Sequence, residues 1–147
     1  MNDLKDLYRE VILDHNKSPR NFGALENADR VVNGVNPLCG DKMTLYLKLD
    51  DDKIEDVRFE GTGCAISVAS SSLMTERVKG ASIEESLELF DNVHEMLTGN
   101  REPDERMEKL AALAGVRDYP SRVKCASLAW HALKTALTST KDAISTE

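Results

Sequence analysis

Three cysteines and an aspartate are the residues of this sequence whose types are best suited to chemistry. Cys39, Cys64 and Cys125 lie far apart in the chain, and Asp41 follows the first of them by two positions. Thiolate sulfur and carboxylate oxygen are both ligands of zinc and of related transition metals. Three thiolates and one carboxylate would complete a four-ligand site if the fold brings these segments together.

Each of these residues also has an ordinary structural interpretation. A single buried cysteine behaves as a small apolar residue, and Cys125 lies on the apolar stripe of its expected helix. The tripeptide Cys39-Gly40-Asp41 is compatible with a plain turn at the entry of a strand. Structural zinc sites usually contain pairs of cysteines two to four residues apart, and no such pair occurs in this chain. Spacing alone therefore does not establish a metal site.

The proposed donor set has a charge that must be balanced. Three thiolates and one carboxylate around a zinc ion leave a net charge of −2, which favours nearby cations. Lys42, Arg122 and Lys124 flank the candidate ligands and are expected to supply them. A carboxylate is a harder donor than a thiolate, so the position that Asp41 occupies would open more easily than a fourth thiolate position.

The composition is that of a globular protein with an acidic balance. The chain has 147 residues, of which 41% are hydrophobic and 31% are charged, and its formal net charge is −7. This length predicts one domain over residues 1–147. The negative charge argues against nucleic acid as a partner. No apolar run approaches the roughly 18 residues that cross a membrane, so we expect no membrane partner.

The N-terminus and the cysteine count indicate a cytoplasmic protein. The segment "MNDLKDLYRE" mixes charged and apolar residues, which is not the pattern of a signal peptide. Three cysteines cannot all pair within one chain, and cytoplasmic thiols normally stay reduced. We therefore expect free thiols that are available as ligands.

Three segments in the first half of the chain have the alternating pattern of strands. They are residues 30–35, 42–50 and 54–61. An amphipathic helix is expected before Pro19, and the chain after residue 64 reads as mostly helical. Strands early and helices late predict an α+β fold, in which a small three-stranded antiparallel sheet packs against helices.

Several helix starts are marked by their residues. Ser82 and Glu85 have the spacing of a capping box, and Pro103 suits the first turn of a further helix. Cys64 follows a Gly-Thr-Gly turn at the start of one helix, and Cys125 is expected in the first turn of another. Free N–H groups at a helix N-terminus stabilise a thiolate, so two of the three cysteines have positions that favour reactivity or metal binding.

Four segments of the chain resemble the motifs of one protein family. They are "LYREVILDHNKSPRNFG", "NPLCGD", "GTGCAIS" and "SRVKCASLAW". In this order they are similar to the opening motif and the three cysteine motifs of the IscU/SufU iron–sulfur cluster assembly proteins, a family of NifU N-terminal-like domains. The resemblance extends from Leu7 to Leu137.

Two departures within the family resemble its SufU branch. Lys124 stands where the cluster-scaffold branch has a histidine, and the segment between Cys64 and Cys125 is long, with an extra helical stretch over residues 100–115. The resemblance to SufU implies that zinc is bound by Cys39, Asp41, Cys64 and Cys125. It also implies that the protein accepts persulfide sulfur from a cysteine desulfurase, which is a pyridoxal-phosphate enzyme.

Residue roles follow from this resemblance and from the expected positions. Cys39 lies on a loop beside Gly40, whereas the other two cysteines are on helices, so Cys39 is expected to be the sulfur acceptor. Arg122 precedes Cys125 by about one helical turn and is expected to pair with Asp41.

Other functions remain open at this point. The same ligands could assemble a transient [2Fe–2S] cluster, or hold iron, for transfer to a downstream scaffold or to apo-proteins, and the zinc could be purely structural. A zinc hydrolase needs an open water position, which four protein ligands do not leave. His15, His94 and His131 are not needed as ligands and are expected to be surface or packing residues.

Overall fold

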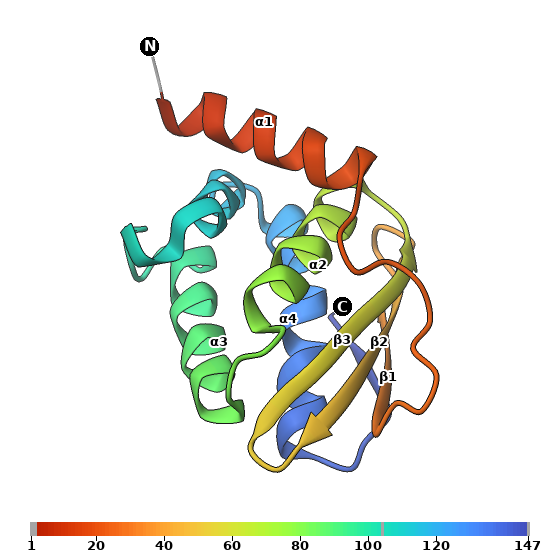
Figure 1. Ribbon diagram of the computed structural model, residues 1–147. Helices are drawn as coiled ribbons and strands as arrows, with labels where there is room; N and C mark the ends of the chain where they lie inside the picture. The colour runs from red at the N-terminus through yellow and green to blue at the C-terminus, as the bar shows by residue number, and fades with distance from the viewer. Residues whose placement is uncertain (1–2, 104, 147) are drawn as a thin grey trace.

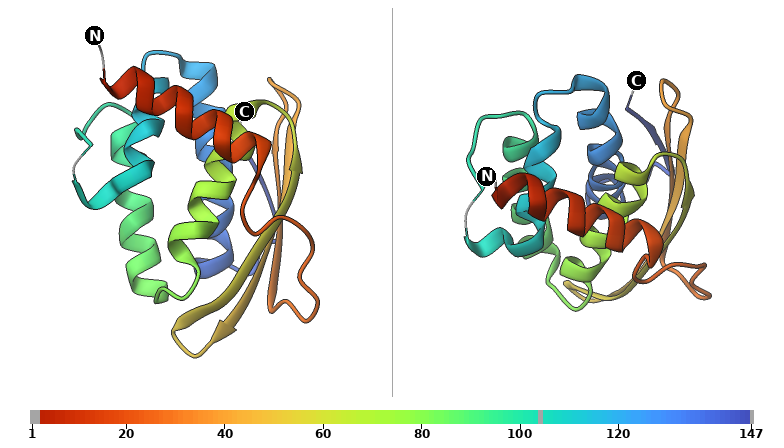
Figure 2. Two further views of the ribbon diagram at one scale, coloured as in Figure 1. Left: turned by 45° about the horizontal axis from the view of Figure 1, so that its top comes forward. Right: turned by 90° about the horizontal axis from the view of Figure 1, so that it is seen from above.

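A mixed sheet with helices on one of its faces forms the framework of the protein (Figure 1 and Figure 2). The computed structural model describes residues 3–103 and 105–146. Along the chain the elements are α1 (Asp3–Lys17), β1 (Arg30–Asn36), β2 (Asp41–Asp50), β3 (Lys53–Thr62), α2 (Ala65–Val78), α3 (Ile83–Leu97), η1 (Glu105–Val116), α4 (Pro120–Thr138) and β4 (Ala143–Ser145). No helix in the described ranges is long and apolar enough to cross a membrane.

The sheet confirms the predicted α+β class but not the predicted sheet. Its strand order is β3-β2-β1-β4; β2 pairs antiparallel with both β3 and β1, and β4 runs parallel to β1. The expectation of a three-stranded antiparallel sheet is therefore wrong. The fourth strand has three residues, which is too short for a recognisable alternating pattern, and it forms because β1 offers a free edge.

The side chain of Ile144 in β4 packs against β1 at Gly34, where the absence of a side chain leaves space. A Cβ atom at Gly34 would lie 3.4 Å from Ile144 Cδ1 and 3.1 Å from Leu128 Cδ1. The missing side chain in β1 thus makes room for residues of β4 and α4 to pack over the same strand. Only the assembled tertiary structure reveals this arrangement.

The alternation predicted for residues 42–50 is confirmed up to Leu47 and ends at an irregularity between Lys48 and Leu49. Met43, Leu45 and Leu47 point into the core, and the residues between them are exposed or half-buried. From β3, Val57 and Phe59 are fully buried on the same side of the sheet. The sheet therefore has one apolar face, and the helices cover it.

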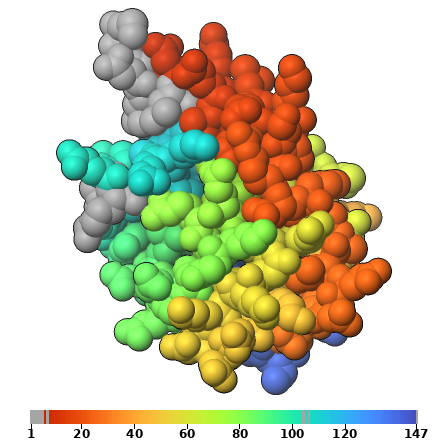
Figure 3. Space-filling model, in the orientation of Figure 1, coloured from red at the N-terminus to blue at the C-terminus, as the bar shows by residue number. Residues whose placement is uncertain are grey.

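Helix α1 lies across the other helices and packs on α2 and η1. In Figure 3, α1 and the loop that follows it form the red-to-orange surface beside green α2 and yellow β3. The predicted capping box of Ser82 and Glu85 is present at the start of α3. The helix expected after Pro103 is a 3₁₀ segment instead, and Glu108 interrupts it with a φ of 51°.

A buried hydrogen bond joins α2 to α4. Ser70 donates to the carbonyl of Ala126 at 2.5 Å and accepts a hydrogen bond from the Trp130 indole Nε1 at 3.0 Å. Both side chains are almost completely buried. The contact matters for function because α2 follows Cys64 and α4 carries Cys125.

Replacing Ser70 with alanine is expected to lower the free energy of unfolding by about 1–3 kcal/mol, because it leaves the buried Trp130 N–H without a partner. Chemical denaturation measures the change. Ser71→Ala is the matched control, since Ser71 is equally buried but, among the described residues, its hydroxyl bonds only to the Ser67 carbonyl within its own helix. Equal losses in the two variants would contradict the assigned role of Ser70.

His15 attaches the end of α1 to α2. Its side chain is fully buried, and its Nδ1 lies 2.7 Å from the Ser72 hydroxyl, which also accepts the backbone N–H of Arg20 at 2.8 Å. Its Nε2 has no hydrogen-bond partner among the described residues. Burial lowers the pKa of His15 below its ordinary value of 6.5. Of the charged groups around it, Arg20 and Lys109 lower this pKa further, whereas Glu76 and Asp14 raise it.

We expect the metal-free protein to lose stability as the pH falls from 7 to 5. The unfolded chain binds a proton at His15 near pH 6.5, whereas the folded chain binds it only at lower pH, so stability is present above this window and is lost on acidification. Burial also lowers the pKa of His131, so His15→Gln should reduce the slope without abolishing it. Denaturant unfolding at several pH values, with a chelator present, measures both slopes. An unchanged slope in His15→Gln would contradict this account.

Candidate metal centre

The predicted ligands come from three segments that meet at one end of the sheet. Cys39 lies in the turn between β1 and β2, and Asp41 is the first residue of β2. Cys64 is the N-cap residue of α2, and Cys125 lies near the start of α4. Helices α2 and α4 both begin at the end of the sheet where β3 finishes (Figure 1). The hairpin and the two helix starts are thus brought together by the topology.

Three of the four predicted ligands form a compact group. One donor atom each from Cys39, Asp41 and Cys125 lies within 4.8 Å of the others. Cys64 lies beside this group, with its Sγ 3.8 Å from Asp41 Oδ2. The structure therefore places all four residues in one neighbourhood, while their role as ligands stays a prediction.

Hydrogen bonds hold the Asp41 carboxylate on both oxygens. Oδ1 accepts the backbone N–H of Cys64 at 2.8 Å, and Oδ2 accepts the side-chain amide of Asn36 at 3.3 Å. The side chain is almost completely buried, and none of the ion pairs among the described residues involves it. A buried carboxylate without a cationic side chain as partner is unfavourable, so this donor set fits a bound metal cation.

The three thiols have different exposures. Cys39 is exposed, Cys64 is half-buried, and Cys125 is buried. Burial raises the pKa of the Cys125 thiol well above its usual value, and Asp41 and the other two cysteines raise it further. Without a metal, Cys125 therefore keeps its proton. A cation bound among these donors would take the place of that proton.

Of the two cysteines expected at helix starts, Cys64 has its predicted position and Cys125 does not. Cys64 caps α2 as expected, and its Sγ accepts the backbone N–H of Ser67 at 3.4 Å. Cys125 is the sixth residue of α4, which places it in the second turn and not in the first. The effect of a helix N-terminus falls off within one turn, so it does not extend to Cys125, where burial is the main cause of the raised thiol pKa.

The cations expected around the ligands lie elsewhere or stay exposed. Arg122 is not paired with Asp41; its guanidinium lies over the Tyr119 ring, 4.9 Å from the centroid, and it lines the same hollow as Tyr8. The predicted Arg122–Asp41 pair is therefore absent from the structure, because both Asp41 oxygens accept N–H donors and Arg122 faces aromatic partners. Lys42 is exposed and Lys124 is half-buried. The Asp41 carboxylate therefore contacts uncharged N–H groups and not these cations.

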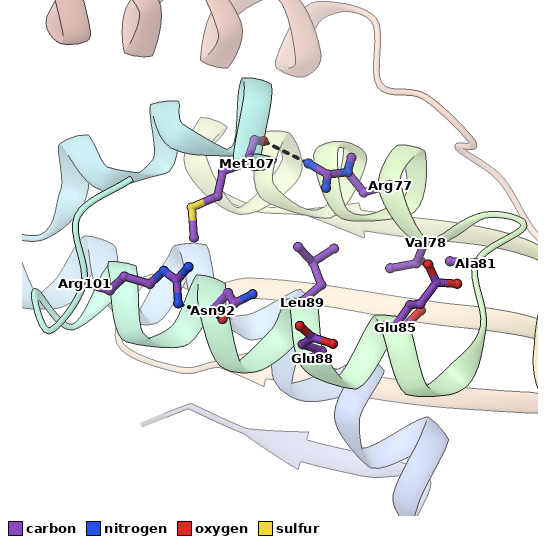
Figure 4. A pocket seen from close by; sticks show the side chains of 10 residues that line it. Arg77, Val78, Ala81, Glu85, Glu88, Leu89, Asn92, Arg101 and Met107 are labelled. Carbon is purple, nitrogen blue, oxygen red and sulfur yellow. Dashed lines mark hydrogen bonds between the residues drawn. The ribbon is translucent and has the colours of Figure 1, made fainter. Parts of the chain in front are cut away.

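None of the residues that line two hollows on the surface is a cysteine. One of about 580 Å³ lies between α1 and the start of α4, where Arg122 and Tyr119 contribute to its lining. The other, of about 320 Å³, lies between α2, α3 and the start of η1 with the segment before it (Figure 4). There Arg77 donates to the Met107 carbonyl at 2.9 Å. Arg77 is about 20 Å along α2 from Cys64, at 1.5 Å per residue, so this second hollow is remote from the site.

The fold and the arrangement of cysteines define a known class of domain. The sequence profile described as "NifU-like N terminal domain" matches residues 7–126. The chain belongs to this family. Iron–sulfur cluster assembly proteins of the IscU and SufU types are among its relatives, as the resemblance of the motifs predicts.

Two curated relatives carry different names. The chain is 46% identical over 138 residues to the "iron-sulfur cluster assembly scaffold protein IscU" of Streptococcus pyogenes serotype M1, which covers 93% of this chain and 86% of the relative. It is 47% identical over 134 residues to the "zinc-dependent sulfurtransferase SufU" of Bacillus subtilis strain 168, which covers 90% of each.

Solved structures agree with the fold. FiSufU of Fervidobacterium islandicum AW-1, described as a cluster assembly scaffold for the SUF system, is 41% identical and superposes with a TM-score of 0.85 over 90% of this chain and 98% of that one. The N-terminal part of a nitrogen-fixing NifU-like protein of Brucella abortus is 31% identical, with a TM-score of 0.82 over 91% and 94%.

Proposed function

We propose that this protein is a zinc-bound sulfur acceptor that takes persulfide sulfur from a cysteine desulfurase for iron–sulfur cluster assembly. The proposed zinc ligands are Cys39, Asp41, Cys64 and Cys125. One observation carries the proposal: the group joins a buried carboxylate, which has no cationic partner among the described residues, to an exposed cysteine. A metal can thus be held on one side of the group while a reactive sulfur faces a partner on the other.

Cys39 is proposed to perform the transfer. Its thiolate attacks the outer sulfur of the persulfide on the desulfurase cysteine, a new S–S bond forms at Cys39, and the old S–S bond breaks. The desulfurase cysteine leaves as a thiolate, so the exchange is balanced and needs no external oxidant or reductant. When bound, zinc would keep the cysteines deprotonated until the partner docks.

The remaining residues would hold the site while Cys39 reacts. Asp41 is fixed by two N–H donors, and Cys64 is fixed as the cap of α2. Cys125 is buried in α4. Cys39 differs from them because it lies in an exposed turn, where Gly40 has a φ of +70°. The turn is therefore the part of the site that a desulfurase can reach.

The relatives support both this proposal and one alternative. The Bacillus subtilis relative is named a zinc-dependent sulfurtransferase, whereas the Streptococcus pyogenes relative is named a scaffold protein. The alternative is a scaffold on which a [2Fe–2S] cluster is assembled and passed to apo-proteins. Lys124, at the position where that branch has a histidine, favours sulfur transfer.

Metal analysis and a desulfurase assay distinguish the two functions. The purified protein is analysed for zinc and iron, then added to a cysteine desulfurase with cysteine while alanine formation is followed. About one zinc per chain and a strong stimulation of alanine formation are expected. A brown, iron-containing protein that does not stimulate the desulfurase would favour the scaffold.

A further inference from the structure

Asn36 contacts two of the proposed ligands with one side chain. It is the last residue of β1 and is fully buried. Its Nδ2 lies 3.3 Å from Asp41 Oδ2 and 3.4 Å from Cys125 Sγ. An amide nitrogen carries two hydrogens, so one side chain can donate to the carboxylate and to the sulfur at the same time.

The chemistry of the neighbours determines which end of the amide faces them. With the amide reversed, Oδ1 would face Oδ2 of Asp41, where two acceptors would oppose each other. With Nδ2 in that place, Oδ1 is buried and has no hydrogen-bond partner among the described residues. A buried carbonyl without a partner is unfavourable for folding. The orientation of Asn36 is therefore explained by the two hydrogen bonds that Nδ2 donates, since its Oδ1 gains none among the described residues.

We propose that Asn36 is a positioning residue for the metal site. Its side chain links Asp41 on β2 to Cys125 on α4. Its two N–H groups point at the carboxylate oxygen and the sulfur, which none of the ion pairs among the described residues involves. This inference rests on the proposed function, because it assumes that Asp41 and Cys125 bind the metal. Hydrogen-bonding partners of metal ligands commonly change affinity by about 10–100-fold when they are removed.

The backbone of Asn36 has a separate role that a side-chain substitution preserves. In the β1–β2 ladder Asn36 is paired with Asp41, and its carbonyl accepts the backbone N–H of Cys39 at 3.3 Å. The hairpin is therefore expected to form without the amide side chain. The effect on metal binding can then be separated from the effect on the fold.

The experiment compares Asn36→Ala with Asn33→Ala. Asn33 is the same residue type in the same strand, but it is exposed and accepts a hydrogen bond from Thr44. Zinc affinity is measured by competition with a chromophoric chelator, and Co²⁺ is added as a spectroscopic probe of thiolate ligation. Asn36→Ala should weaken zinc binding by about 10–100-fold and alter the thiolate-to-cobalt charge-transfer band. Asn33→Ala should change neither.

Each outcome decides the inference. A loss of affinity of less than about tenfold, with an unchanged cobalt spectrum, would overturn it. If circular dichroism shows that Asn36→Ala is unfolded, Asn36→Ser is measured in the same way, since it keeps one short donor and should also weaken binding. Wild-type protein that binds no zinc would refute the proposed function instead, so the two failures are distinguishable.

Discussion

The Cys39→Ser variant is expected to accept no sulfur from a desulfurase persulfide. A serine hydroxyl cannot form a persulfide, and the other two cysteines are half-buried and buried, where a docked partner reaches them less readily. After incubation with a desulfurase and cysteine, mass spectrometry of the wild-type protein should show one added sulfur on the peptide that contains Cys39. In the variant the labelling should fall to background, and the stimulation of alanine formation should be lost with it.

Asp41→Ala is the matched control for this result. It also removes a proposed ligand, but it leaves the Cys39 thiol in place, so measurable labelling of Cys39 should remain. An exposed substitution changes stability by about 0.5 kcal/mol or less, so metal-free Cys39→Ser should unfold at the same denaturant concentration as the wild type. Sulfur found on Cys64 or Cys125 in Cys39→Ser would show that the acceptor is assigned wrongly.

The Gly63→Ala variant is expected to lose both stability and zinc affinity. Gly63 has a φ of +135°, and a Cβ there would overlap Asp41 Oδ1 and lie 2.8 Å from the Asp41 Cα. The backbone strain costs about 1–3 kcal/mol and the overlap a similar amount. We expect the free energy of unfolding to fall by about 2–6 kcal/mol in total. Denaturation and the same chelator competition measure the two effects.

Gly80→Ala separates backbone strain from the steric effect on the site. Gly80 also has a positive φ, +83°, but a Cβ there would meet no atom within 4 Å. This variant should lose about 1–3 kcal/mol and bind zinc as the wild type does. If Gly63→Ala retained wild-type zinc affinity, the close approach of Gly63 to Asp41 would have no importance for the site.

Most elements of the fold could be predicted because their signals are local. The apolar residues of β2 recur at every second position, and Ser82 with Glu85 marks the start of α3. Strand β4 could not be predicted, because its pairing depends on the free edge of β1 and on the space beside Gly34. The 3₁₀ geometry of η1 was equally hidden, since the sequence there has the periodicity of a regular helix.

The residues around the proposed ligands were harder to predict than the ligands themselves. Lys42, Arg122 and Lys124 were expected near the acid because they are close to it or to Cys125 in the sequence. Closeness along the chain does not determine where a long side chain points, and Arg122 instead lies over Tyr119. Asn36 and Gly63 do not stand out in the sequence, because an amide and a glycine beside a cysteine motif are also common in ordinary turns.

The sequence by itself determined the family, the α+β class and the four candidate metal ligands, because motifs and periodicities are properties of residue order. The tertiary structure alone decided how these residues differ. It buries Cys125, leaves Cys39 exposed, and surrounds Asp41 with N–H donors from Asn36 and Cys64. These differences arise because β1, β2, α2 and α4 approach one another in space, and no local pattern in the chain records their distances.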